Sequence, residues 1–350
     1  MNDMDNVFYT APREPDESPV ITQEQADPKE VRRHFSLIGW GYTVLLLGMM
    51  ALATAIQLVI AELWPWLFAA WWMNWFLSLV PLYGIGLPLL WLILRQADRA
   101  PHNALCVDAY AVTRQKPPFT FGKWMLLLTI GLGCMYAGGI AGNIIMNILS
   151  EITGHDYANH LNSMVNDSPL WMTFLATCII APLGEELLFR KLLIDRTRRY
   201  GDAAAILLSG LLFGLFHGNL FQFFYAFLLG MILAYMYTRT DNLWWCVAMH
   251  AVINLLGSIV IPAIGSVIPT DGSEITSIWP ILATLFLLAW EFGFIIVGIV
   301  LFCVFWHRRK LSPSAVLLPG KGMAPVFLNP GMVVCLACMI GITVLGLIPR

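Results

Sequence analysis

Three ionisable residues lie close together inside an apolar run that has the composition of a membrane helix. The run reads Ala-Pro-Leu-Gly-Glu-Glu-Leu-Leu-Phe-Arg over residues 181–190. A charged side chain near the bilayer centre costs between ~2.5 and over ~10 kcal/mol, so such residues are typical of functional sites and have partners. Glu186 and Arg190 are spaced to form an ion pair on one helical face. Glu185 points about 100° away round the helix and must face another element.

Two later apolar segments carry polar side chains that could meet Glu185. His217 ends the segment that contains Phe213, and His250 and Asn254 lie together in a later segment. The i, i+4 spacing directs His250 and Asn254 to the same side of one helix. Because helix bundles turn such residues inward, these side chains predict one shared polar site.

Composition places the chain among polytopic membrane proteins. Of its 350 residues, 58% are hydrophobic and 12% are charged, whereas soluble domains carry roughly 25% charged residues. The net charge of −2 gives no general attraction to nucleic acid, so we expect no nucleic-acid partner. We expect membrane lipid around the protein and predict that it is a multi-pass protein of the bacterial cytoplasmic membrane. The sequence indicates no oligomeric state.

Nine apolar segments reach or approach the ~20 residues that a ~30 Å hydrocarbon layer requires. The sequence therefore predicts an all-α bundle of about nine transmembrane helices. The fifth segment is short, and its glycines at 210, 214 and 218 are typical of a helix that its neighbours approach closely. The nine segments cover residues 36–61, 68–94, 124–149, 169–194, 203–217, 221–239, 243–261, 278–306 and 331–349.

The distribution of basic residues predicts the orientation of the bundle. Every Lys and Arg except Arg350 falls at or near the side on which the N-terminus lies, if each segment crosses the membrane. The connections 150–168 and 262–277, on the other side, carry acidic residues and no basic one. The positive-inside rule therefore places the N-terminus in the cytoplasm.

The chain divides into four predicted parts. Residues 1–35 are polar and acidic and predict a disordered cytoplasmic tail. Residues 36–150 hold three transmembrane helices, residues 169–258 hold the polar site, and residues 259–350 hold two further transmembrane helices.

Three short motifs, EExxxR, FxxxH and HxxxN, follow one another on successive apolar segments. They occur here as Glu185-Glu186…Arg190, Phe213…His217 and His250…Asn254. The ordered set resembles the CAAX protease and bacteriocin-processing (CPBP) family, which includes the type II CAAX prenyl endopeptidases. The resemblance covers about residues 169–258, roughly a quarter of the chain.

The resemblance implies an intramembrane endopeptidase. It implies that Glu185 is the general base that activates a water molecule for attack on a peptide carbonyl, assisted by His217. It also implies that His250 and Asn254 donate hydrogen bonds to the oxyanion of the tetrahedral intermediate. A positioned base contributes ~10²–10⁴ and an oxyanion donor ~10²–10³ in rate, so loss of either is expected to abolish measurable turnover.

Supporting roles are implied for three further motif residues. Glu186 and Arg190 are expected to fix the helix as an ion pair and to hold a substrate carboxylate, with Phe213 as a further supporting residue. The substrate is expected to be a membrane-associated peptide or protein tail, and nothing in the sequence encodes a prenyl pocket. Because hydrolysis needs water, we expect a cavity, and the polar groups near the cytoplasmic side predict that it opens inward.

Depth along the helices and metal chemistry are two open questions. At 1.5 Å per residue, His250 lies roughly 10 Å and Glu185 roughly 15 Å from the cytoplasmic boundary, whereas His217 lies deeper unless its helix is offset. Glu185, His217 and His250 are also the ligand types of a catalytic zinc site, although no HExxH motif joins two of them. We expect no cofactor and no metal, with zinc-dependent hydrolysis as the alternative.

Two other functions are alternatives to a protease. One is a non-catalytic bacteriocin-immunity or membrane scaffold protein of the same family. The other is a transporter with Glu185, Glu186 and Glu291 as proton carriers, although the sequence has no evident inverted repeat. Glu291 lies in the middle of the eighth segment, and we expect it either to be hydrogen-bonded within the bundle or to line the route of the substrate.

Overall fold

The computed structural model describes residues 24–25, 27–97, 119–157, 159–269, 277–306, 311, 316–317 and 322–348. Most of the predicted N-terminal tail and most of the loop before the third segment lie outside these residues. The all-α class and the polytopic helical bundle are confirmed. The exception to the helices is a parallel pair of two-residue strands, β1 (Glu24–Gln25) and β2 (Val316–Leu317).

Each of the nine predicted segments is helical. Within the described part of the chain, seven helical stretches are long and apolar enough to cross a membrane. Two shorter apolar helices, α10 (Asp202–Phe216) and α16 (Pro330–Leu345), account for the other segments. The number of spans and the side of the N-terminus remain predictions. The seven long stretches are Pro28–Leu63, Met73–Leu94, Phe121–Thr153, Leu170–Tyr200, Leu220–Thr240, Leu243–Gly265 and Trp279–Phe305.

Several of these stretches contain more than one helical element. The bounds before the site region are α1 (Pro28–Leu63), η2 (Pro65–Ala69), α2 (Met73–Leu79), η3 (Val80–Gly86), α3 (Leu87–Leu94), α5 (Phe121–Thr153) and α6 (His160–Asn166). The site region contains α7 (Leu170–Thr173), η5 (Phe174–Ile180), α8 (Ala181–Glu186), η6 (Leu187–Leu192), α9 (Leu193–Thr197), η7 (Arg198–Tyr200), α10, α11 (Leu220–Thr240), α12 (Leu243–Leu255), η8 (Leu256–Val260) and α13 (Ile261–Gly265). The C-terminal part contains α14 (Trp279–Trp306), α15 (Ala324–Phe327) and α16.

Helix α1 begins earlier than the sequence predicted. The tail was expected to extend to residue 35, but residues 28–35 are helical, and Val31 and Phe35 are buried. The start has a local cause, because the Asp27 side chain accepts a hydrogen bond from the backbone N–H of Lys29, and Pro28 takes the first helical position. Both residue types are favourable at these places.

Four segments adopt the wider π-helical geometry, and three of them contain a proline or end two residues before one. Pro81 lies in η3, Pro182 follows η5, and Pro262 follows η8. Proline has no N–H to donate to the carbonyl four residues earlier, so the local hydrogen-bond register shifts instead of continuing as a regular α-helix. Such π-helical turns are frequent at functional sites, and η5 lies immediately before the two glutamates of α8.

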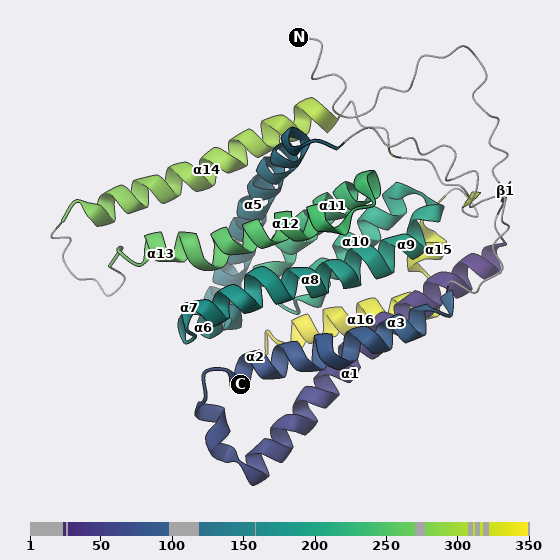
Figure 1. Ribbon diagram of the computed structural model, residues 1–350, viewed down its shortest axis with the longest axis horizontal. Helices are drawn as coiled ribbons and strands as arrows, with labels where there is room; N and C mark the ends of the chain where they lie inside the picture. The colour runs from purple at the N-terminus through teal and green to yellow at the C-terminus, as the bar shows by residue number, and fades with distance from the viewer. Residues whose placement is uncertain are drawn as a thin grey trace.

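The helices that carry the motifs form the middle of the bundle. Figure 1 shows α8, α10, α11 and α12 between α1, α3 and α16 on one side and α5 and α14 on the other. The contacts agree, because α10 packs on both α11 and α16, α1 packs on α3 and α16, and α5 packs on α11 and α14. The N-terminal and C-terminal helices therefore enclose the motif-bearing helices from two sides.

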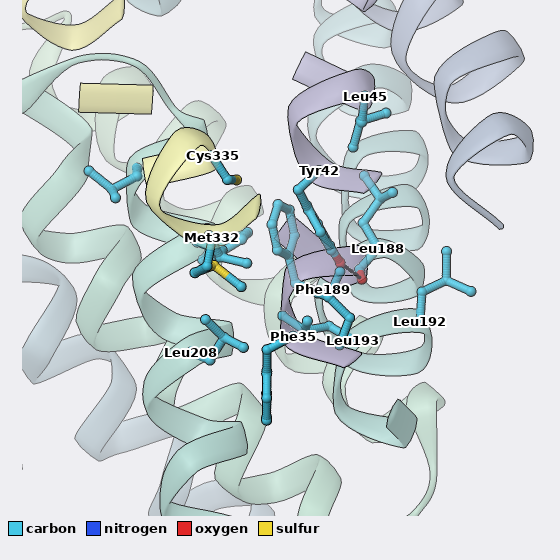
Figure 2. Close-up of a cluster of buried hydrophobic side chains, with 14 of the residues drawn as sticks. Phe35, Tyr42, Leu45, Leu188, Phe189, Leu192, Leu193, Leu208, Met332 and Cys335 are labelled. Atoms are coloured by element: carbon cyan, nitrogen blue, oxygen red, sulfur yellow. Dashed lines mark hydrogen bonds between the residues drawn. The ribbon is translucent and has the colours of Figure 1, made fainter. Parts of the chain in front are cut away.

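A dense apolar core joins α1 and α16 to the helices of the site region (Figure 2). Phe35, Phe189 and Met332 are completely buried in it. The Tyr42 hydroxyl, a polar group within this core, donates a 2.6 Å hydrogen bond to the carbonyl oxygen of Leu188. This core fills the bundle near the ends of the helices that carry Lys and Arg.

The close approach predicted for the fifth segment is present at two of its three glycines. A Cβ at Gly210 would lie 3.1 Å from the Phe227 carbonyl oxygen of α11, and one at Gly214 would lie 2.9 Å from the Phe227 Cβ. Gly218 differs, because it follows the helix with a φ of +64° and makes the turn into α11. Glycine adopts this left-handed conformation without the steric cost that other residues have.

Candidate active site

A cavity of about 1160 Å³ lies within the bundle. Drug-sized ligands typically occupy sites of ~300–1,000 Å³, so this cavity has room for a segment of peptide. Glu185, His217, His250 and Asn254, which sequence analysis placed in the site, all line it. Four side chains from three separate helical stretches therefore share one space.

Glu185 faces the cavity with its side chain 18% exposed. Its Oε2 lies 3.7 Å from His250 Nε2. On the other oxygen, the Tyr83 hydroxyl donates a 3.4 Å hydrogen bond to Oε1. The carboxylate is therefore held between a tyrosine of η3 and a histidine of α12, and it remains open to a molecule in the cavity.

His250 is oriented by Glu186, the neighbour of the proposed base. Its Nδ1 lies 2.8 Å from Glu186 Oε1, and both side chains are almost completely buried. An ionised carboxylate only accepts hydrogen bonds, so Nδ1 carries the proton in this pair. The contact directs the other ring nitrogen toward Glu185 and the cavity, an arrangement in which a second carboxylate fixes the orientation of a functional histidine.

The predicted ion pair between Glu186 and Arg190 is present. Arg190 Nε lies 3.1 Å from Glu186 Oε2, and both side chains are 0% exposed. Arg190 also donates a 3.3 Å hydrogen bond to the Gly230 carbonyl oxygen, and its guanidinium lies 4.5 Å from the centroid of the Phe213 ring. Neither Glu186 nor Arg190 lines the cavity, so a substrate carboxylate does not reach the arginine in this structure.

Phe213 separates the two histidines and packs against both. Its ring centroid lies 5.1 Å from that of His217 and 5.8 Å from that of His250, edge to face in each case. His217 Nδ1 lies 2.8 Å from the Phe213 carbonyl oxygen and donates to it, because a carbonyl is an acceptor only. His217 Nε2 is thereby left as the nitrogen available to the cavity.

Asn254 lies one helical turn after His250 and contacts the π-helical segment η5. Its Nδ2 donates a 2.7 Å hydrogen bond to the carbonyl oxygen of Thr177. An amide nitrogen has two N–H groups, so one of them is used to tie α12 to η5. The second remains for a partner in the cavity.

The cavity extends toward the connection between α5 and α7, which contradicts the expected inward opening. Its wall includes Tyr157, Asn159 and Leu161 of that connection, and no described lining residue is a Lys or Arg. The reason lies in the packing, because the core shown in Figure 2 fills the bundle near the basic ends of the helices. With the predicted orientation, the cavity reaches the outer face of the membrane.

The part of the chain that carries the three motifs is similar in sequence to a known family of proteins. Residues 167–256 match the family model described as "Type II CAAX prenyl endopeptidase Rce1-like". The match covers about a quarter of the chain. The resemblance predicted from the three motifs is confirmed for these residues, and we refer to them as the Rce1-like segment.

A curated relative points in the same direction. The chain is 25% identical over 124 residues to the protein of Bacillus subtilis (strain 168) named "Putative membrane peptidase YdiL". The match covers 34% of this chain and 49% of that protein, so the chain spans about half the length of the relative. No solved structure matches the chain. Together the comparisons and the apolar helices indicate a multi-pass membrane protein that is similar in part to an endopeptidase family and to a putative membrane peptidase.

Tyr83 belongs to the site but lies outside the Rce1-like segment, and sequence analysis missed it. The ring lies against Gly184 so closely that a Cβ there would be 2.2 Å from Tyr83 Cε1. The glycine before the two glutamates therefore makes room for a side chain from another helix. A tyrosine between Pro81 and two glycines in an apolar helix was the available signal, and it does not by itself identify a partner.

Replacing Gly184 by alanine is expected to lower kcat/KM. The added methyl group displaces Tyr83 and with it Glu185. Because misplacement of a catalytic group by ~1 Å costs on the order of 10²-fold in rate, we expect a loss of this size. Hydrolysis of a reporter peptide by the purified protein measures the change. Gly48→Ala is the matched control, since a Cβ at Gly48 meets nothing within 4 Å. Equal activity of the Gly184→Ala and Gly48→Ala variants would contradict the positioning role of Tyr83.

Metal binding remains open for this site. Among the residues that the structure describes, no group of three His, Cys, Asp or Glu side chains is arranged to hold a metal ion. His250 Nδ1 is engaged with Glu186, and His217 Nδ1 is engaged with a backbone carbonyl. Histidines that bind a metal through Nε2 commonly donate Nδ1–H to a carboxylate or a backbone carbonyl, so these two contacts are compatible with a metal, and an experiment described below measures the metal content.

Proposed function

We propose that the chain is an intramembrane endopeptidase that hydrolyses a peptide bond of a membrane-associated peptide or protein. The observation that carries the proposal is the pairing of the Glu185 carboxylate with the His250 imidazole, 3.7 Å apart, on the wall of a large cavity inside a membrane bundle. The Rce1-like match supports it, because the model is that of an endopeptidase family. We further propose the bacterial cytoplasmic membrane as the location.

Glu185 acts as the general base in this mechanism. A water molecule in the cavity lies between the Glu185 carboxylate and the carbonyl carbon of the substrate. The carboxylate takes a proton from the water while the oxygen forms a bond to that carbon. His217 lines the same cavity and helps to hold the water through its free ring nitrogen. A base held in position in this way contributes ~10²–10⁴ in rate.

His250 and Asn254 stabilise the charge that develops on the substrate oxygen. Asn254 offers the amide N–H that Thr177 does not use. His250 offers Nε2 in its doubly protonated form, in which Nδ1 continues to donate to Glu186. Donors that are already oriented stabilise an oxyanion without reorganisation, and each contributes ~10²–10³ in rate.

Glu186 and Arg190 position the catalytic groups without touching the substrate. Glu186 holds His250, and Arg190 neutralises Glu186 within the apolar interior.

In the second half of the reaction, protonated Glu185 gives its proton to the leaving amine as the C–N bond breaks. Glu185 is then an ionised carboxylate again, and water must refill the cavity before the next turnover.

A comparison of peptides from two strains tests the proposal. We expect mass spectrometry of membrane and secreted fractions to find fragments in the wild-type strain that are missing in a Glu185→Ala strain, in which longer precursors accumulate. Glu62→Ala is the matched control, because Glu62 is exposed on α1 and does not line the cavity. Identical peptide sets in the wild-type and Glu185→Ala strains would refute the proposed protease.

The metal content of the purified protein decides between the two hydrolytic mechanisms. We expect less than stoichiometric zinc and full activity after treatment with a chelator. Zinc bound at one ion per chain, with activity lost on chelation and restored by zinc, would replace the mechanism above by metal-dependent hydrolysis.

A further inference from the structure

Glu291 is an acidic residue on the cavity wall that the proposed mechanism does not use. It is the only acidic or basic side chain in α14, whose sequence is otherwise apolar with a few small polar groups. Most of this helix exposes large apolar side chains, such as Leu285, Phe292 and Ile296, as a lipid-facing helix does. Because a carboxylate at such depth costs ~2.5 kcal/mol or more, it is expected to serve a function and to have a partner.

The position of Glu291 is fixed by the packing of α14 on α5. Trp290 Nε1 donates a 2.6 Å hydrogen bond to the Tyr136 hydroxyl of α5. Further along, the backbones touch, since a Cβ at Gly133 would lie 2.5 Å from the Phe294 carbonyl oxygen. These contacts prevent α14 from turning, and they hold Glu291 on the cavity side of the helix.

Glu291 has no partner of opposite charge within the described part of the chain, where its recorded neighbour is the uncharged Tyr136 hydroxyl on the same cavity wall. The structure gives its carboxylate no hydrogen bond and no ion pair with any residue placed in it. The cavity wall carries two carboxylates, Glu185 and Glu291, and two histidines, but no Lys or Arg among its described lining residues. A cationic group in the occupant of the cavity would give Glu291 the partner of opposite charge that the described wall lacks.

The acidic residues around the cavity also favour an occupant with a positive charge. The last turn of α5 and the connection from α5 to α7, which supplies part of the wall, carry exposed acidic side chains at Glu151, Asp156 and Asp167 and no Lys or Arg. Arg190, the cation nearest to the catalytic groups in sequence, is 0% exposed, forms an ion pair with Glu186 and does not line the cavity. A substrate with a free C-terminal carboxylate near Glu185 would find no positive side chain on this wall.

We propose that Glu291 binds a cationic group of the substrate and that the cavity selects membrane-associated peptides that carry a Lys or Arg side chain or a free N-terminal ammonium. The binding step stands by itself, whereas its role in substrate selection rests on the proposed protease. A carboxylate and a cation that meet away from bulk water form a charge-assisted hydrogen bond, which is stronger than a neutral one.

Binding of designed peptides to the full-length protein in detergent tests the inference. The probe is a fluorescent, N-acetylated Leu/Ala peptide with one central lysine, and its partners carry norleucine or aspartate at that place. We expect the lysine peptide to bind at least about tenfold more tightly than the norleucine peptide, a difference of ~1.4 kcal/mol. In Glu291→Gln the ratio of the two dissociation constants is expected to fall to about one.

Three controls separate the possible causes. Glu291→Asp is expected to retain part of the preference, and Glu62→Gln, which removes an exposed carboxylate away from the cavity, is expected to retain all of it. The norleucine peptide with a free amine tells whether an N-terminal ammonium serves as well as a lysine. Unfolding curves of each variant identify a loss of fold.

The outcomes for Glu291 and for the protease are distinguishable. Equal binding of the lysine and norleucine peptides to the wild-type protein, or a lysine preference that Glu291→Gln leaves intact, would overturn the inference about Glu291. A Glu291-dependent preference without cleavage of any peptide would uphold this inference and count against the protease. Cleavage of a peptide without a Glu291-dependent preference would support the protease and overturn the inference about Glu291.

Discussion

Glu185→Gln is expected to lower the kcat of peptide hydrolysis by up to about 10⁴-fold while the protein stays folded. Glutamine keeps the shape of the side chain and can still contact Tyr83, but its amide cannot take a proton from water. Since the base acts only during the reaction, KM is expected to change little. Initial rates with a fluorogenic reporter peptide and purified protein measure the effect.

The control for this variant is a glutamate of the same bundle without a place on the cavity wall. Glu151→Gln meets this condition, because Glu151 is exposed at the end of α5 and does not line the cavity. It is expected to keep wild-type activity. A Glu185→Gln protein with wild-type kcat would show that another group, or a metal-bound water, activates the nucleophile.

Arg190→Met is expected to destabilise the protein by ~3–5 kcal/mol, because it leaves the Glu186 charge buried without its cation. Both side chains are 0% exposed, so water cannot replace the lost partner. Removing both charges, in Glu186→Gln with Arg190→Met, is expected to recover most of this loss, since glutamine can still accept the hydrogen bond from His250. Chemical unfolding in detergent of the wild type, the two single variants and the double variant completes a double-mutant cycle.

A second ion pair on the same helix provides the control. Lys191 and Asp195 have the same spacing and lie 2.6 Å apart, but their side chains are 53% and 27% exposed. Exposed pairs of this kind contribute ~0–1 kcal/mol, so Lys191→Met is expected to have little effect. Similar losses in Arg190→Met and Lys191→Met would contradict the view that burial gives the Glu186 pair its importance.

The local features of the site could be predicted from sequence. Apolar length identified the helices, and the i, i+4 rule predicted the ion pair of Glu186 with Arg190 and the common face of His250 and Asn254. The ordered motifs indicated the family that the comparison confirms for residues 167–256. Each of these features depends on neighbours within one helix or on the order of motifs along the chain.

The features that depend on distant packing could not be predicted. The contact of Tyr83 with Glu185 joins two helices far apart in the chain, and nothing in the local pattern pairs them. The opening of the cavity depends on where bulky apolar side chains fill the bundle, and apolar residues occur at both ends of these helices. The depth estimate placed His217 deeper than Glu185 and His250, whereas all three side chains line one cavity. Helices differ in their offset along the membrane normal, and an estimate from sequence does not include this offset.

The absence of Lys and Arg from the described part of the cavity wall has a consequence for the release of products. Hydrolysis creates a new carboxylate at the end of one fragment, next to Glu185 and in the same enclosed space as Glu291. Like charges at short range in a poorly hydrated space repel one another strongly, and Arg190 is too deeply buried to compensate. In the proposed protease, this repulsion is expected to speed the departure of the newly acidic fragment and so to leave the cavity free for the next substrate.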